Sequence, residues 1–241
     1  MKKALVLLFA SILLHANEVE DIVRKVDHNM RGKTLYVKMK MTVQTAHHKR
    51  SMELESWSEG KKKNFVKVLA PSREYGITFL SLDGQMWQYV PKIERIIKIP
   101  PSMMLQKWMG SDITNDDVVK QSSIVDDYTP KLLGKKGTIV TISLIPKPQA
   151  TVVWGKIVTQ IDTRTYTSVQ EVYYDQEGTK VRVFDYADVK QYGKYYLPTL
   201  WKVKPFDAPG HLTTIKIEDA RYDAPIDPAY FSLSALKRFS N

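Results

Sequence analysis

The chain has no cysteine among its 241 residues. It can therefore form no disulfide, no thiolate zinc site, no iron–sulfur cluster and no cysteine nucleophile. Acidic residues are the minority charge, with 26 Asp and Glu against 36 Lys and Arg, so the formal net charge is +10. With 43% hydrophobic and 26% charged residues the composition is that of a globular chain, which excludes disordered and collagen-like architectures.

Long apolar runs are also missing, apart from one at the N-terminus. Lys2 and Lys3 precede an apolar stretch over residues 4–14, which has the length of a signal-peptide core and is too short for a membrane-spanning helix. We expect a cleaved signal peptide over 1–16. No cysteine follows it that could carry a lipid anchor, so we predict one exported, soluble domain over 17–241.

The mature chain begins with a predicted helix. Apolar residues recur at helical spacing from Val19 to Met30, and Gly32 follows as a helix stop, so we expect an amphipathic helix over about 18–31. From residue 35 the apolar period drops to two, which predicts a half-exposed antiparallel strand over 35–43.

Strands dominate the rest of the chain. Turn pairs such as Asp83-Gly84 separate apolar or alternating segments, as in β-hairpins. Together with 35–43, the predicted strands are 51–58, 63–70, 76–82, 85–91, 94–99, 138–146, 152–162, 168–175, 179–187, 195–204 and 211–219. A sheet of about a dozen strands rarely stays flat, so we expect it to curl into a barrel, a half-barrel or a sandwich.

The middle of the chain interrupts the strands. Ser102 can cap a short apolar helix predicted over 103–109, and Gly110 stands where a left-handed residue would end it. A second short helix is predicted to begin at Thr114 or Asn115. Because the first of these helices is almost entirely apolar, we expect it to pack against the concave face of the curled sheet.

Methionine is concentrated in the first half of the chain, and the eight methionines after Met1 all lie before residue 110. Methionine suits a surface that accepts variable apolar shapes, and it also fills gaps in ordinary cores, so both interpretations stay open. The functional interpretation places an apolar cavity between the sheet and the helix 103–109. Its candidate ligand-binding residues are Met39, Met41, Met86, Trp87, Met103, Met104, Leu105, Trp108 and Met109.

Positive charge is concentrated over residues 31–70, which hold ten Lys and Arg against three Glu. We predict a basic sheet edge that meets anionic lipid head groups or an acidic partner protein. Its candidate residues are Lys38, Lys40, Lys61, Lys62 and Lys63. The alternative is a lysine-rich edge that resists strand-to-strand aggregation. Export argues against a nucleic-acid partner.

Tyrosine is concentrated in two late hairpins, with six tyrosines between residues 173 and 196. Cross-strand ring packing on a curved sheet explains this concentration. We therefore do not assign these tyrosines to binding.

Motifs for catalysis or metal binding are missing from the sequence: it contains no P-loop, G-x-S-x-G or H-E-x-x-H pattern. His47 and His48 would point to opposite faces of a strand, so we assign them to a solvated hairpin. The three aspartates over 112–117 lack the spacing of a calcium loop and fit helix capping. Ser111 has no histidine near it in sequence. We predict no enzyme, no cofactor and no metal.

Four segments carry a family resemblance. Residues 86–91 (MWQYVP), 93–100 (IERIIKIP), 108–117 (WMGSDITNDD) and 230–239 (YFSLSALKRF) resemble the outer-membrane lipoprotein-sorting-like proteins, relatives of the LolA/LolB carriers. The most specific part is Gly110, Ser111 and Asp112, which we interpret as a structural motif or lid hinge. With the leader, the first helix and the strands, the resemblance covers essentially the whole mature chain.

The resemblance implies a mainly β, α+β fold: an incomplete antiparallel β-barrel, or half-barrel, of about 11–12 strands with an N-terminal helix. Short helices would cover its concave apolar face. It also implies a periplasmic location, a part in outer-membrane biogenesis, and acyl chains as ligand. The related carriers hold their lid with an arginine in the sheet, a role that the sequence does not assign to Arg50, Arg73 or Arg95.

Three functional hypotheses follow. The first is a monomeric periplasmic carrier that transports lipid or lipoprotein by holding acyl chains between the sheet and a helical lid, and delivers them to an outer-membrane acceptor. The second is an accessory subunit of an RND-type lipid exporter in the inner membrane, docked by the basic sheet edge. The third is a periplasmic lipid hydrolase that uses Ser111.

Overall fold

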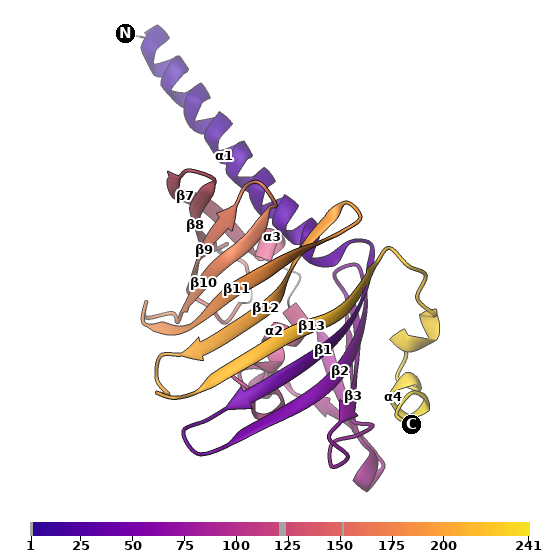
Figure 1. Ribbon diagram of the computed structural model, residues 1–241. Coiled ribbons are helices and arrows are strands. Elements are labelled where there is room, and N and C mark those ends of the chain that lie inside the picture. Colours follow the sequence, from indigo (N-terminus) through magenta and orange to yellow (C-terminus); the bar gives the residue numbers. More distant parts are fainter. Residues whose placement is uncertain (1, 121–123, 151) are drawn as a thin grey trace.

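Thirteen antiparallel strands form one sheet in the computed structural model, which describes residues 2–120, 124–150 and 152–241, and side chains from residue 17 onward except that of residue 120. The strand order is β6-β5-β4-β3-β2-β1-β13-β12-β11-β10-β9-β8-β7. All neighbours are consecutive in sequence except β1 and β13, whose pairing joins the two halves of the chain. The sheet curls without closing (Figure 1), and the predicted half-barrel fold is confirmed.

The elements have the following bounds. The strands are β1 (Thr34–Gln44), β2 (Lys49–Glu59), β3 (Lys63–Ala70), β4 (Thr78–Leu82), β5 (Gln85–Val90), β6 (Arg95–Ile99), β7 (Tyr128–Lys136), β8 (Ile139–Pro146), β9 (Lys156–Asp162), β10 (Thr167–Tyr174), β11 (Lys180–Tyr192), β12 (Tyr195–Pro205) and β13 (Leu212–Tyr222). The α-helices are α1 (Lys2–Arg31), α2 (Asn115–Lys120), α3 (Ile124–Asp127) and α4 (Ala235–Arg238). Short 3-10 turns are η1 (Pro91–Ile93), η2 (Pro101–Met103), η3 (Trp108–Gly110) and η4 (Pro228–Phe231).

Alternation along β1 builds the concave face, as the sequence predicts. Leu35, Val37 and Met41 are buried, whereas Lys40 on the other face is exposed. Successive side chains of a strand point to opposite faces, so the period of two separates core from solvent. The register places Lys40 opposite Glu53 of β2, a cross-strand pair of opposite charge on the outer face.

The C-terminal end of α1 is fixed to the sheet by one buried asparagine. The side-chain amide of Asn29 donates to the carbonyl oxygens of Thr165 and Tyr166, at 2.7 and 3.1 Å, and its oxygen accepts from the backbone N–H of Tyr196. Gly32 then ends the helix with a φ of +60°, a conformation that glycine adopts without strain. The apolar side of α1 is thereby held over the concave face.

The convex side of β3, β4 and β5 is covered by the C-terminal segment (Figure 1). Phe65, Leu80 and Tyr89 pack there with Phe231 and Leu236 in a second apolar cluster, separate from the main core. The first three alternate with residues of the concave face, because neighbours in a strand point to opposite sides. This segment of the sheet therefore has a core on both faces.

Two expectations about the sheet are wrong. The sheet has thirteen strands, one more than the sequence predicts, and the additional strand is β7. Its exposed lysines, proline and glycine hide the alternation, which is typical of an edge strand. The predicted basic edge is also wrong, since β1, β2 and β3 lie in the middle of the sheet and the free edges are β6 and β7.

The predicted leader falls on the first part of α1. The side chains of residues 1–16 lie outside the described part of the structure. In the part that is described, no helix is both long and apolar enough to cross a membrane.

We expect Leu236→Ala to lower the free energy of unfolding by about 2–5 kcal/mol, because Leu236 is fully buried between α4 and the convex face. Leu233→Ala, in the same segment but with a side chain 48% exposed, should change it by less than about 0.5 kcal/mol. Urea denaturation followed by circular dichroism measures both. Equal effects would show that α4 does not pack on the sheet in solution.

Candidate functional site

An apolar cavity of about 280 Å³ lies between the concave face, α1 and the short helices α2 and α3. Helix α1 contributes Val23, Val26 and Met30 to its wall. Both halves of the sheet contribute aliphatic and aromatic side chains to it: Leu35, Val37, Met39, Val66, Leu144, Ile157, Ile161, Tyr173, Phe184, Tyr186, Leu197, Trp201, Ile215 and Ile217. The cavity exists because the curled sheet is not filled by its own side chains.

One side of the cavity is closed by residues 101–119, here called the lid segment. Its first part is not the α-helix predicted over 103–109 but two 3-10 turns, and Met109 inside the second has a φ of +49°. The backbone N–H of Asp116 donates to the Met104 carbonyl oxygen at 2.8 Å, and that of Trp108 to the Ile113 carbonyl oxygen at 2.7 Å. The lid segment is therefore a compact unit with its own hydrogen bonds.

The second predicted short helix is present as α2, and it begins with a capping box. The backbone N–H of Thr114 donates to the Asp117 carboxylate at 2.7 Å, and the N–H of Asp117 donates to the Thr114 hydroxyl at 3.3 Å. Reciprocal bonds of this kind satisfy the free N–H groups at a helix start. They also fix the Asp117 carboxylate at the side of the helix that faces the sheet.

A buried ion pair connects this carboxylate to the sheet. Arg182 of β11 donates from Nη1 and Nη2 to the two Asp117 oxygens, at 2.6 and 2.5 Å, and from Nη1 to the Asp112 carbonyl oxygen at 3.3 Å. Its guanidinium lies 4.4 Å from the ring centre of Trp154 and 4.7 Å from that of Tyr173. Burial alone would lower the pKa of Arg182, but the Asp117 charge outweighs it and the pKa is raised. The Arg182 guanidinium therefore stays charged.

The sequence could not identify Arg182 as the arginine that holds the lid segment. Both faces of its strand carry apolar residues, Val181 and Val183 on one and Phe184 on the other. The sequence therefore does not indicate which face points toward the core. Of the three arginines considered from sequence, Arg50 donates a hydrogen bond to the Met109 carbonyl oxygen. Arg73 and Arg95 are exposed.

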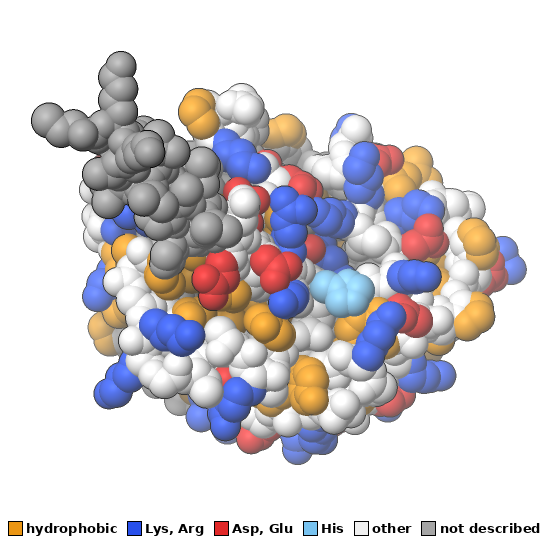
Figure 2. All heavy atoms as spheres, turned by 90° about the horizontal axis from the view of Figure 1, so that it is seen from above, with side chains coloured by type: hydrophobic (Ala, Val, Ile, Leu, Met, Phe, Trp, Pro, Cys, Tyr) orange, Lys and Arg blue, Asp and Glu red, His pale blue; other side chains and the backbone are white. Residues whose placement is uncertain are grey.

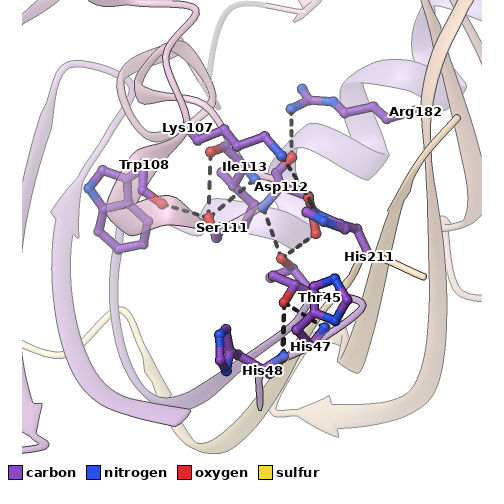
Figure 3. A network of polar contacts seen from close by, with 11 residues as sticks. Thr45, His47, His48, Lys107, Trp108, Ser111, Asp112, Ile113, Arg182 and His211 are labelled. Carbon is purple, nitrogen blue, oxygen red and sulfur yellow. Dashed lines mark hydrogen bonds and ion pairs between the residues drawn. The ribbon is translucent and has the colours of Figure 1, made fainter. Parts of the chain in front are cut away.

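Asp112 is a second point of attachment, in the polar network of Figure 3. Its carboxylate accepts from the Thr213 hydroxyl of β13 at 2.8 Å, and its N–H donates to the same hydroxyl oxygen at 2.9 Å. Lys107 Nζ lies 3.3 Å from the carboxylate and His211 Nδ1 lies 3.7 Å from it. The predicted motif of Gly110, Ser111 and Asp112 thus lies where the lid segment meets β13.

Ser111 does not have the geometry of a nucleophile. Its fully buried hydroxyl donates to the Trp108 carbonyl oxygen at 2.7 Å and accepts from the Ile113 N–H, and in Figure 3 it points away from His211. His47 and His48 are exposed in the turn between β1 and β2, where the backbone bonds to Thr45. Across the described residues no group of three or more His, Cys, Asp or Glu is placed to hold a metal ion.

The nine predicted cavity residues lie in different parts of the structure. Met39 and Trp108 line the cavity, whereas Met41 and Met86 are fully buried in the core outside it. Trp87 packs in the convex cluster, because adjacent residues of β5 cannot both face one cavity. Among the lid residues, Leu105 is 55% exposed, and three others pack partly buried against the main core without lining the cavity: Met103, Met104 and Met109.

The five predicted patch lysines occupy two places. Lys38 and Lys40 lie on the outer face of β1 opposite Glu55 and Glu53. The other three lie in and beside the β2–β3 turn at the mouth of the cavity, and each contacts an acid there: Lys61 with Asp126, Lys62 with Asp83 and Lys63 with Glu59. Figure 2 shows acidic, basic and hydrophobic side chains intermixed over the face that it displays.

The cavity wall also contains a polar cluster that the sequence does not predict. The Glu171 carboxylate of β10, 8% exposed, accepts hydrogen bonds from Ser168, Tyr173 and Tyr186 at 2.8, 3.0 and 3.0 Å. Burial and the Glu171 charge raise the pKa values of both tyrosines well above the usual range, so the phenols remain neutral donors. The two tyrosines were assigned to ring packing alone, since the sequence does not say which strand faces turn toward the cavity.

The chain belongs to a family whose members are described as uncharacterised proteins. The model of this family matches residues 60–238, and the family carries the designation DUF1329. No curated protein matches the chain.

Solved structures with the same fold include three from bacteria. A DUF1329 family protein from Desulfovibrio piger matches with a TM-score of 0.84 and 20% identity, over 92% of this chain and 98% of that one. An outer membrane lipoprotein-sorting protein domain from Vibrio parahaemolyticus matches at 0.80 and 20%, over 92% and 100%. A LolA superfamily protein from Nitrosomonas europaea matches at 0.74 and 15%, over 89% and 97%. The resemblance predicted from the sequence is confirmed as a shared fold.

We expect Arg182→Gln and Asp117→Asn each to lower the free energy of unfolding by about 3–5 kcal/mol, because each leaves a buried charge without its partner. The double variant Arg182→Met, Asp117→Leu should cost less than either single change. As a control, Arg221→Gln breaks an exposed pair with Asp219 and should cost less than about 1 kcal/mol.

Urea denaturation gives the free energies, and hydrogen exchange over residues 112–119 reports on the lid segment. A double variant Arg182→Gln, Asp117→Asn whose cost equals the sum of the two single changes would mean that the pair does not form in solution.

Proposed function

We propose that this protein is a periplasmic carrier that encloses acyl chains of a lipid or lipoprotein in the cavity. The observation that carries the proposal is the apolar cavity between the concave face, α1 and the lid segment. Apolar side chains dominate its wall, so it removes a hydrocarbon chain from water, which contributes about 0.8 kcal/mol per buried methylene. The fold shared with lipoprotein-sorting and LolA superfamily proteins supports this role.

The size of the cavity limits the ligand. At about 280 Å³ it is close to the lower end of the roughly 300–1,000 Å³ that is common for small-molecule pockets. It therefore accepts one chain or part of one with the lid segment in place, and a ligand with several chains requires the lid segment to move. The internal hydrogen bonds of the lid segment allow it to move as a unit when the contacts of Arg182 and Arg50, and those between Asp112 and Thr213, break.

The mouth of the cavity supports contact with anionic head groups. Lys61 and Lys62 are exposed and line the cavity, so they mark the point where it meets solvent. Each basic group near an anionic leaflet contributes about 1 kcal/mol. We propose that this end faces a membrane, or an inner-membrane transporter or outer-membrane acceptor, during loading and release. The functional unit would be the domain over 17–241 after removal of the leader.

The carrier hypothesis is tested by filling the cavity. Val26→Trp together with Met39→Trp adds ring volume from α1 and from β1 into the same space. We expect the variant to stay folded and to co-purify with at most about one-fifth of the lipid carried by the unchanged protein, because the chain and the rings compete for one volume. Native mass spectrometry of protein isolated from its own cells measures the bound lipid and identifies it.

The matched control is Val169→Trp, which adds a ring at an exposed position of β10 and should leave bound lipid unchanged. Lipid that remains at full occupancy in the cavity-filled variant would contradict the carrier proposal. So would an unchanged protein that carries no lipid and takes up none from vesicles.

Membrane contact is tested by charge reversal at the mouth. Lys62→Glu should slow transfer of a fluorescent lipid to vesicles containing anionic phosphatidylglycerol by about fivefold, a loss of roughly 1 kcal/mol of attraction. Lys131→Glu makes the same charge change on β7 and should have little effect, because Lys131 is exposed and does not line the cavity. Equal effects of the two changes would argue for attraction by net charge and against an oriented mouth.

A further inference from the structure

The Glu171 cluster, defined as Glu171 with Ser168, Tyr173 and Tyr186, places a buried carboxylate in the wall of an apolar cavity. Removing a carboxylate from water is costly unless a cation or several hydrogen bonds compensate it. Three hydroxyl groups donate to Glu171. A carboxylate has about four acceptor positions, so one remains for a further donor.

The cations near the cavity are engaged elsewhere. Arg182 makes its bidentate pair with Asp117, and Arg31 pairs with Asp27 on α1. Lys61, Lys62 and Lys63 contact acids at the mouth. Among the described residues, Glu171 forms hydrogen bonds with hydroxyl groups only, so its charge is not neutralised by a bonded cation.

Aromatic rings flank this carboxylate. The ring of Phe184, directly opposite Glu171 on β11, stacks on Tyr186 at 6.0 Å, and Tyr186 meets Trp201 edge to face at 5.7 Å. Ring faces attract cations within about 6 Å of their centres. Part of this wall already holds one, since the Arg182 guanidinium lies 5.0 Å from the Phe184 ring centre.

We propose that the Glu171 cluster binds the ammonium group of a cationic or zwitterionic amphiphile whose alkyl chain occupies the cavity. This inference rests on the proposed function, since it requires that the cavity take up a chain. An ammonium group donates to the remaining acceptor position of Glu171 and lies against the rings of Tyr186 and Trp201. A hydroxyl head group makes the hydrogen bond but carries no positive charge for the carboxylate and the rings to attract. An anionic head group is repelled by the carboxylate.

Matched twelve-carbon ligands test the inference. Dodecylammonium, dodecanol and dodecyl sulfate, each below its micelle concentration, compete with the neutral fluorescent probe N-phenyl-1-naphthylamine for the cavity of the full mature protein. We expect dodecylammonium to bind at least tenfold more tightly than dodecanol, and dodecyl sulfate to bind most weakly. Lysophosphatidylethanolamine distinguishes the source of the ammonium: competition equal to that of dodecylammonium favours a phospholipid head group, and weaker competition favours a simple amine.

Glu171→Gln keeps the shape and the acceptor oxygen but removes the charge, so we expect the preference for dodecylammonium over dodecanol to fall below twofold. Asp185→Asn is the matched control: it removes the same charge from β11, where the side chain bonds to Gln170 and Lys204 and does not line the cavity. The control should retain the tenfold preference.

Tyr186→Phe gives a second readout that does not depend on the folding of the Gln variant. It keeps the charge and frees one acceptor position of Glu171, so dodecylammonium should bind more tightly while dodecanol is unchanged. Equal binding of dodecylammonium and dodecanol, or a preference that survives Glu171→Gln, would overturn the inference and leave the carrier proposal intact. Failure of the probe and of all the ligands to bind would instead overturn the carrier proposal.

Discussion

A sheet of thirteen strands that curls without closing has a concave apolar face. The rest of the structure depends on the segments that cover this face and shield it from water. Apolar surface left in water costs about 25 cal/mol per Å². Helix α1 covers one part through Val19, Ile22 and Val23, and the lid segment covers another through Trp108 and Ile113. The two covers do not fill the concavity, so a cavity remains between them.

Polar contacts position both covers. Asn29 fixes the end of α1 through bonds to three backbone groups, and Arg182 fixes the lid segment through Asp117 and the Asp112 carbonyl. Hydrogen bonds depend on direction and are lost over short displacements, whereas burial of apolar area is gradual. The proposed carrier function requires that a chain be both enclosed and released, and therefore that the lid segment separate from the sheet without unfolding. The internal hydrogen bonds of the lid segment favour movement as one unit.

Charge is distributed differently in the cavity and at its mouth. Lysines of the β2–β3 turn lie at the mouth beside acidic partners, and Glu171 lies in the inner wall among hydroxyl groups and rings. The cavity is therefore not a uniform hydrocarbon surface. In the proposed function, an amphiphile with a polar end would have a preferred orientation in the cavity, and the apolar wall formed by residues such as Ile157 and Ile217 would accept a chain without regard to its identity.

Local sequence patterns determined the faces and the ends of several helices and strands. Alternation over 35–43 set the buried face of β1, Gly32 set the end of α1, and Thr114 with Asp117 set the start of α2, because each depends on neighbours within a few residues. The curled sheet also followed from the number of strands, although the edge strand β7 lacks the alternation and was missed.

Only the tertiary structure decided which strand faces meet across the cavity. β5 and β11 are apolar in both phases, so the sequence could not show that Met86 points to the core, Trp87 to the convex cluster and Arg182 to the lid segment. For the same reason the sequence could not show that β8–β13, which the curl brings opposite α1 and β1, contribute a large part of the wall, or that Met39 lines the cavity and Met41 does not. Glu171 accepts hydrogen bonds from Tyr186 and Ser168 because strand pairing and the register shift of β10 between Ser168 and Gln170 bring these side chains to it. Such contacts depend on three-dimensional packing.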